Sequence, residues 1–141
     1  MTKHKILCIL LTFFILFSSI PFSPVSADSI GKEAGACRDL GILIGSDATG
    51  VTSKYLATTP NRAQALIIFL RLKGLYMTAG SEAFDTNFKD AYTLDWAKAY
   101  LGYAKNNPHL GWIGQPDGNF APSDKINAKS FNKTMLETLG Y

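Results

Sequence analysis

The stretch that decides the fold is residues 110–122, which read LGWIGQPDGNFAP. An apolar run between glycines leads into a turn at Pro116, Asp117 and Gly118, because proline presets one turn residue and glycine accepts a positive φ. A shorter echo stands earlier in the chain, at residues 40–45, which read LGILIG. Self-similarity on this scale predicts two supersecondary units that stack to bury a shared apolar face. A repeated module favours a binding protein over an enzyme.

Helices are predicted on either side of each apolar run, which makes the chain mainly α-helical. In the later half, one helix is expected over residues 95–106, ended by Pro108, and another over residues 127–139 with Asn127 as its N-cap. The residues expected to face inward follow helical spacing; they are Ala97, Tyr100, Leu101 and Ala104 in the first helix and Phe131, Met135 and Leu139 in the second.

The earlier half has one strong helix, which runs from Asn61 to Gly74. Asn61 and Gln64 have the spacing of a capping box, and Gly74 is a typical helix end. The inward positions are Ala63, Leu66, Ile67 and Leu70. Around this helix the sequence predicts a short helix over residues 29–40 with Ile30, Ala34, Cys37 and Leu40 on one face, a buried extended piece over residues 41–45, a loop over residues 46–59 and an irregular link over residues 78–87.

Residues 1–27 have the pattern of a secretory signal peptide. Lys3 and Lys5 precede an apolar run over residues 6–17, and small residues precede the expected cleavage after Ala27. The run is shorter than the roughly 20 residues that a membrane-spanning helix needs. We therefore expect an exported chain that starts at Asp28 and is not held in a membrane after cleavage, with an uncleaved anchor as the alternative.

The composition of the expected mature chain fits one small domain. Removing 27 residues from 141 leaves 114, and losing two lysines lowers the formal charge from +3 to +1. This balance does not support a nucleic-acid partner. Cys37 is the one cysteine left, so no intramolecular disulfide forms. A small buried apolar role is expected for it, with a reactive thiol or an intermolecular bridge as the alternative.

Ten residues of the later half match, in order, the pattern of the S-layer homology module. The pattern is Phe-x-Asp, Trp-Ala, a glycine-flanked run and Asp-Gly-x-Phe-x-Pro, and the matching residues are Phe88, Asp90, Trp96, Ala97, Gly111, Gly114, Asp117, Gly118, Phe120 and Pro122. The earlier half resembles the module less completely, since residues 61–64 read Asn-Arg-Ala-Gln where the family has Thr-Arg-Ala-Glu. The resemblance predicts a divergent repeat over residues 28–80 and a second repeat over residues 84–141.

The resemblance also implies a fold and a function. The fold would be a set of tandem helix-loop-helix repeats packed side by side, forming an incomplete pseudo-threefold prism because family members typically carry three repeats. The function would be non-catalytic anchoring at a bacterial cell wall or surface, by binding secondary cell-wall polysaccharide that is often pyruvylated. A homo-oligomer or another S-layer homology protein would cover the open face. The alternative is a surface protein that keeps this fold but associates with a partner protein instead of a glycan.

Arg62 is the leading candidate for a ligand-binding residue. It stands in the first turn of a helix, where its positive charge opposes the helix dipole by about 0.3–1 kcal/mol. A cation beside free backbone N–H groups suits a carboxylate ligand. An ion pair with Asp39, Asp85 or Asp90 is the structural alternative. The adjacent Gln64 belongs to the same motif.

The remaining candidates are carried by the second repeat. Ala128 holds the position that matches Arg62, and Lys129 follows it, so we expect a weak or absent second site. Trp96 and Trp112 are candidates for a sugar-stacking face, although we favour core packing for Trp96. Asp90 is a candidate ligand contact, with a turn cap as the favoured alternative.

Catalytic and metal sites find little support in the sequence. The expected mature chain has one histidine, His109, and no Gly-x-Ser-x-Gly nucleophile motif. One cysteine and one histidine do not make a soft-ligand metal site. Asp117 and Asn119 lack the further oxygen ligands of an EF-hand loop. We therefore expect neither an enzyme nor a cofactor.

Overall fold

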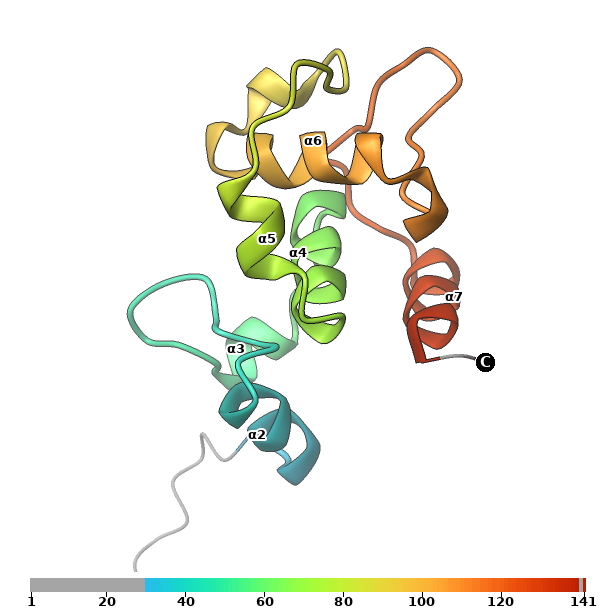
Figure 1. Cartoon of the computed structure of the whole chain (residues 1–141). Coiled ribbons are helices and arrows are strands. Elements are labelled where there is room, and N and C mark those ends of the chain that lie inside the picture. The colour runs from blue at the N-terminus through green and yellow to red at the C-terminus, as the bar shows by residue number, and fades with distance from the viewer. Residues whose placement is uncertain (1–29, 140) are drawn as a thin grey trace, which may run out of the picture.

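The computed structural model describes residues 30–139 and 141, and within them the chain is mainly helical (Figure 1). The helices are α2 (Lys32–Asp39), α3 (Ser53–Leu56), α4 (Arg62–Leu72), α5 (Tyr76–Ser81), α6 (Lys98–Asn106) and α7 (Ala128–Leu139), with 3-10 turns η1 (Ala91–Thr93), η2 (Asp95–Ala97) and η3 (Pro108–Leu110). The described residues form no strand, apart from one isolated bridge between Asn61 and Lys125. This confirms the mainly α class. The predicted signal peptide lies outside the described residues.

Helix α4 occupies the centre of the molecule. It packs against α5, α6 and α7, and Figure 1 shows α5 and α7 on opposite sides of it. Six of its residues are buried, because its sequence is apolar on more than one face. All of them except Ile67 join side chains from the later half in one core, which includes Phe88, Ala91, Ala97, Leu101, Ala104, Trp112, Phe120 and Ile126. The two halves therefore share a single hydrophobic core.

The start of α4 is built as its sequence predicts. The Asn61 side-chain oxygen accepts the Gln64 N–H at 2.8 Å, and the Gln64 side-chain oxygen accepts the Asn61 N–H at 2.9 Å. The capping box is thus confirmed. At the other end, Gly74 has φ 70°, the left-handed conformation that the prediction required.

Backbone hydrogen bonds connect the start of α4 to the loop that precedes α7. The N–H groups of Arg62 and Ala63 donate to the carbonyls of Asp124 and Pro122, at 2.8 and 3.0 Å. In return, the Ile126 N–H donates to the carbonyl of Pro60 at 3.1 Å. Segments 60–63 and 122–126 thereby fix the earlier and later halves of the chain to one another.

The later half follows its predicted pattern closely. Helix α6 begins at Lys98 behind the 3-10 turn η2, and Leu101 and Ala104 on it are fully buried. The Asn127 side-chain oxygen caps α7 by accepting the Ser130 N–H at 2.8 Å. Phe131 and Met135 pack against the core as predicted. The side chain of Leu139 lies outside the described residues.

The segment before α4 departs from prediction in three places. Helix α2 starts at Lys32 and buries none of its residues, so Cys37 is only half-buried and Leu40 is 75% exposed. The prediction that the extended piece over residues 41–45 is buried is wrong, since Ile44 is 55% exposed. The predicted loop contains the short helix α3. The main core cluster of the described residues is formed by side chains from Ala63 onward, so the segment before α4 packs outside it.

The link after α4 is also more ordered than predicted. Helix α5 occupies residues 76–81, although residues 78–87 were expected to be irregular. Its Ala79 is fully buried and its Tyr76 stacks on Tyr100 of α6, with ring centroids 5.0 Å apart. Tertiary packing therefore overrides a sequence with weak helix propensity.

Candidate functional site

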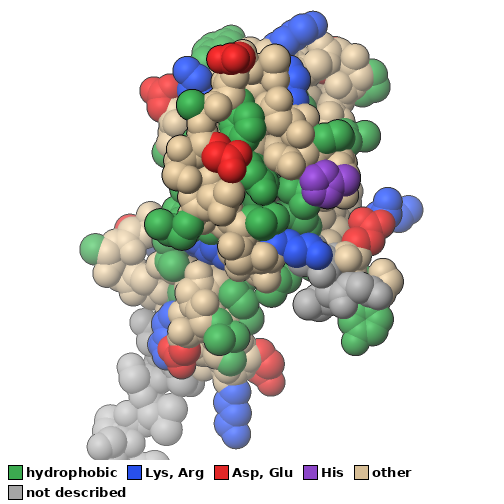
Figure 2. Space-filling model, in the orientation of Figure 1, with side chains coloured by type: hydrophobic (Ala, Val, Ile, Leu, Met, Phe, Trp, Pro, Cys, Tyr) green, Lys and Arg blue, Asp and Glu red, His purple; other side chains and the backbone are tan. Residues whose placement is uncertain are grey.

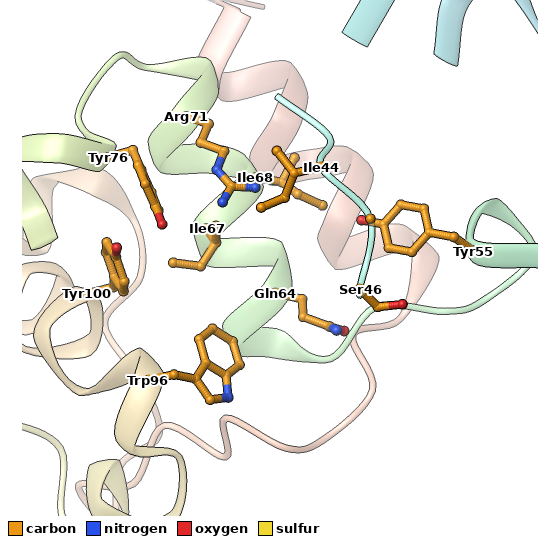
Figure 3. A pocket seen from close by; sticks show the side chains of 11 residues that line it. Ile44, Ser46, Tyr55, Gln64, Ile67, Ile68, Arg71, Tyr76, Trp96 and Tyr100 are labelled. Carbon is orange, nitrogen blue, oxygen red and sulfur yellow. The ribbon is translucent and has the colours of Figure 1, made fainter. Parts of the chain in front are cut away.

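A groove of about 490 Å³ opens beside α4 (Figure 3). Side chains from α4, α5, α6 and η2 meet there with residues from the segment before α4. The lining residues are Ile44, Gly45, Ser46, Tyr55, Gln64, Ile67, Ile68, Arg71, Tyr76, Trp96 and Tyr100. They include four aromatic rings and one cation, and they include no carboxylate. A concave, partly apolar surface with a few polar groups is the usual form of a ligand site.

The floor of the groove is one face of α4. Gln64, Ile67, Ile68 and Arg71 follow the i, i+3, i+4, i+7 spacing that places side chains on one side of a helix. This stripe runs along α4 from the capping residue Gln64 at the N-terminal end to the positively charged Arg71 at the C-terminal end. It lies beside the core-facing stripe. Ile67, which was predicted to face the core, is buried in the groove floor and is not part of the core cluster.

One wall of the groove is aromatic. Trp96 is 52% exposed, although a large apolar ring gains most when it is buried. Tyr76 and Tyr100 stack with an interplanar angle of 12°. Figure 3 shows Trp96, Tyr100 and Tyr76 following one another along one side of the groove. The opposite wall comes from Ile44, Ser46 and Tyr55. Flat rings at an open edge are suited to stacking on a sugar or another flat ligand.

Arg71 is the charged group of the groove. Its guanidinium carbon lies 4.5 Å from the centroid of the Tyr76 ring, and Figure 3 shows the guanidinium directed between Tyr76 and Ile44. Among the described residues, no carboxylate lies within 4.0 Å of it. The positive charge is therefore available to a ligand.

The tyrosine pair shares a hydrogen bond next to Arg71. The hydrogen bond from Tyr100, followed by the one from Arg71, lowers the pKa of Tyr76. Burial, followed by the hydrogen bond to Tyr76, raises the pKa of Tyr100 to about 12. Both effects follow from Tyr100 acting as donor and Tyr76 as acceptor, since a donated hydrogen bond favours the phenolate of the acceptor. Because the single O–H of Tyr100 is directed at Tyr76, Tyr100 has no second O–H to offer a ligand.

Arg62 lies outside the groove. Its Nε–H donates to the carbonyl of Phe120 at 2.8 Å, and its guanidinium carbon stacks 4.8 Å from the Phe120 ring centroid. Burial lowers the pKa of Arg62, while the carboxylates of Asp124 and Asp90 act in the opposite direction. The expectation of free backbone N–H groups beside Arg62 is wrong, because the bonds to Asp124 and Pro122 use them.

The expected ion pair of Arg62 is not formed within the described part of the chain. None of its carboxylates, including those of Asp39, Asp85 and Asp90, lies within 4.0 Å of the Arg62 guanidinium. Asp90 instead holds a backbone turn. Its two carboxylate oxygens accept the N–H groups of Phe120 and Ala121, at 2.8 and 2.7 Å. Arg62 and Asp90 thus fasten the same loop from two sides.

The two tryptophans exchange the environments that were expected for them. Trp112 is 4% exposed and lies in the core, 5.7 Å in an edge contact from the Phe69 ring, so it cannot form a stacking face. Trp96, for which core packing was favoured, is the exposed one. Of the predicted site residues, the groove contains Gln64 and Trp96. Arg62, Asp90 and Trp112 lie elsewhere, and Lys129 is an exposed residue of α7, where Ala128 holds the first helical position.

Sequence reasoning missed Arg71, Tyr76 and Tyr100 as groove residues. A usable signal was the second stripe of α4, which places Ile68 and Arg71 outside the predicted core face although Ile68 is strongly apolar. An apolar side chain on the face away from the core indicates a further contact or a binding surface.

Comparison of the chain with protein-family models, curated proteins and solved structures finds no match. Among residues 30–139 and 141, no helix is long and apolar enough to cross a membrane. The same residues contain no group of three or more His, Cys, Asp or Glu side chains that could hold a metal ion. On the face shown in Figure 2, acidic and basic side chains are interspersed, with hydrophobic side chains between them.

Proposed function

We propose that this chain is a non-catalytic module of the bacterial cell surface that binds a cell-wall polysaccharide in the groove beside α4. The observation that carries the proposal is Trp96, a half-exposed aromatic ring at the open edge of that groove. A sugar that stacks on this ring with its apolar face would shield the ring from water while the ring keeps its place in the groove. Gln64 and Ser46 supply amide and hydroxyl groups that can bond to sugar hydroxyls.

The resemblance to the S-layer homology module supports the same function. Helices α4 and α7 each begin directly after a capping asparagine, and they pack against one another. This pairing supports two tandem helix-loop-helix repeats, over residues 28–80 and 84–141, as part of an incomplete prism. The chain would then be secreted and retained at the wall, and a second copy or another protein of that family would cover its open side.

The test is co-sedimentation of the chain from Asp28 with purified Gram-positive cell walls. Trp96→Ala should weaken binding by about fivefold, because stacked aromatic contacts contribute on the order of 1 kcal/mol. Tyr92→Ala is the matched control, since Tyr92 is 74% exposed and outside the groove. The proposal fails if the wild-type chain does not pellet with the walls, or if the Trp96 variant pellets as well as the Tyr92 variant.

Association with a partner protein is the second candidate function. Leu136 on α7 is 50% exposed beside the partly buried Met135, which gives this helix an apolar edge. A protein adaptor would lose its partner on Leu136→Lys and keep it on Trp96→Ala, whereas a glycan-binding module would show the opposite pattern.

A further inference from the structure

The groove beside α4 lies between two parts of the chain. One wall, formed by Ile44, Ser46 and Tyr55, belongs to residues 30–59, which we call the appended segment. The floor and the aromatic wall belong to residues after position 60. Figure 3 shows the two walls on either side of the α4 side chains, and Figure 1 shows α2 and α3 at one end of the molecule. The position of the appended segment therefore sets the width of the groove.

The polar contacts of the appended segment are made within the segment itself. Among the described residues, each hydrogen bond or ion pair of residues 30–58 joins two members of that range. At the last residue of the segment, the carbonyl of Thr59 accepts a hydrogen bond from the exposed Lys125 Nζ at 3.2 Å. A lysine side chain has a flexible stem, so this bond can follow a movement of the backbone.

Apolar packing joins the appended segment to the rest of the chain over a small area. The main core cluster begins at Ala63, and the close packing between helices involves α4, α5, α6 and α7. Among the described hydrophobic side chains of residues 30–59, Val51 is the buried one. Two parts of a chain that share a small interface are expected to move relative to one another.

The appended segment itself holds together as one body. The carbonyl of Cys37, near the end of α2, accepts the N–H groups of Ile42 and Leu43 at 2.9 and 3.2 Å. Gly45 lies against the backbone of Gly50, so closely that a Cβ atom at position 45 would clash with the Gly50 carbonyl. This approach brings the chain that leaves α2 next to the chain that enters α3. Both helices and the loop between them should therefore move together.

The link between the two bodies is short and exposed. Thr58 still bonds to α3, since its N–H donates to the Tyr55 carbonyl at 3.0 Å. Pro60 is held by the rest of the chain, because its carbonyl accepts the Ile126 N–H at 3.1 Å. The backbone of Thr58 and Thr59 connects these two points, and both residues are exposed. A few loop residues that absorb changes in φ and ψ are the usual form of a hinge.

We propose that the appended segment turns as one body about Thr58 and Thr59, and that this motion opens and closes the groove. The motion goes beyond the proposed function, since it belongs to the chain whatever ligand the groove takes. In the closed form, Ile44 approaches Trp96, and both side chains, which are 55% and 52% exposed, lose contact with water. A ligand that touches both walls shifts the population toward the closed form.

The first test measures the motion in the wild-type chain from Asp28, without a ligand. Residual dipolar couplings of backbone N–H groups report the averaging of orientation by hinge motions, which take microseconds to milliseconds. The couplings of residues 30–58 should fit an alignment tensor about twofold smaller than the tensor of α4 and α6. Helix α7 is the internal control and should share the tensor of α4. A single tensor that fits the appended segment and all of these helices would overturn the inference.

The second test measures the distance between spin labels by double electron–electron resonance. Cys37→Ser removes the native thiol, and Lys54→Cys with Lys98→Cys places one exposed label on α3 and one at the start of α6. Lys98→Cys with Lys129→Cys is the matched control, since α6 and α7 both pack against α4. We expect a distance distribution about twofold broader for the first pair than for the control pair. Equal widths would contradict the inference, because the appended segment would then be as fixed as α7.

Both measurements use the free chain, so their outcome does not depend on the wall assay. A chain that shows the motion and does not pellet with walls keeps the hinge and loses the proposed function. A rigid chain that pellets with walls keeps the proposed function and loses the hinge.

Discussion

Two arginines of α4 carry the same charge in different surroundings. Arg62 is half-buried, donates to a backbone carbonyl and covers the Phe120 ring. Arg71 contacts one tyrosine ring and otherwise faces the groove. A buried hydrogen-bond donor that loses its partner lowers the stability of the fold, whereas a donor at an open site can exchange a bound water for a ligand. The first arginine is therefore suited to holding the fold, and the second is suited to recognition.

We predict that Arg62→Ala lowers the free energy of unfolding by about 1–3 kcal/mol, through loss of one hydrogen bond to Phe120 and of the stacking contact. Urea denaturation followed by circular dichroism measures this change. Lys129→Ala is the control and should stay within about 0.5 kcal/mol, since Lys129 is exposed. Equal stability of the two variants would contradict the structural role of Arg62. Weaker wall binding by Arg62→Ala at a temperature where it stays folded would instead support the sequence-based prediction of a direct ligand contact.

At the scale of elements, the turn after η3 depends more on Gly114 than on Gly111. Gly114 has φ 75°, and a Cβ atom there would lie 2.5 Å from the Phe88 ring and 2.8 Å from the Asn119 carbonyl oxygen. Gly111 has φ 83°, but a Cβ atom there would meet open space. Both positions strain an L-residue, and only position 114 also forces a clash with the core.

We predict that Gly111→Ala lowers the free energy of unfolding by about 1–2 kcal/mol, the usual penalty of a left-handed non-glycine residue. Gly114→Ala should cost clearly more, about 3 kcal/mol or above, because Phe88 and the 114–119 turn must move as well. Thermal and urea unfolding of the two variants measure the difference. Similar losses of stability would show that the turn adapts to the added methyl group and that the contact with Phe88 is not tight.

The elements that the sequence predicts well are those specified by local chemistry. The caps of α4 and α7 and the turn at Gly118 depend on residues within three or four positions of one another, and all are present. The environments of Trp96 and Trp112 could not be assigned in this way. Both rings gain from burial, and the choice between them depends on where Phe69 and Phe120 lie in space.

The groove could not be predicted from the sequence for a related reason. On α4, the predicted core stripe and the groove stripe are offset by about 100° and share Ile67, so periodicity alone accepts either face as buried. Helix α5, which carries Tyr76 to the groove, was missed because its stability comes from Ala79 and Tyr76 contacts outside its own sequence. A site assembled from α3, α4, α5, η2, α6 and residues 44–46 is a property of their packing, and local patterns do not contain it.

On the scale of the whole molecule, the described chain divides into a packed part and an appended part. The main core cluster is formed by residues between positions 63 and 126, joined by partly buried side chains of α7. In residues 30–59, Val51 is the buried hydrophobic residue, and α2 buries none. The appended segment nevertheless supplies one wall of the groove, through Ile44, Ser46 and Tyr55. Stability and binding should therefore depend on different parts of the chain.

We predict that a chain consisting of residues 60–141 folds, with a free energy of unfolding lower by about 1.5–3 kcal/mol, the value of burying one side chain such as Val51. Thermal unfolding followed by circular dichroism measures this change. The same chain should bind walls more weakly than the chain from Asp28, because the groove has lost the wall that faces Trp96 and Arg71. A control with Tyr55→Ala in the longer chain should reproduce part of the loss without the change in length. If residues 60–141 fail to fold, the appended segment belongs to the cooperative unit; if they fold and bind at full strength, the wall formed by residues 44–55 has no part in recognition.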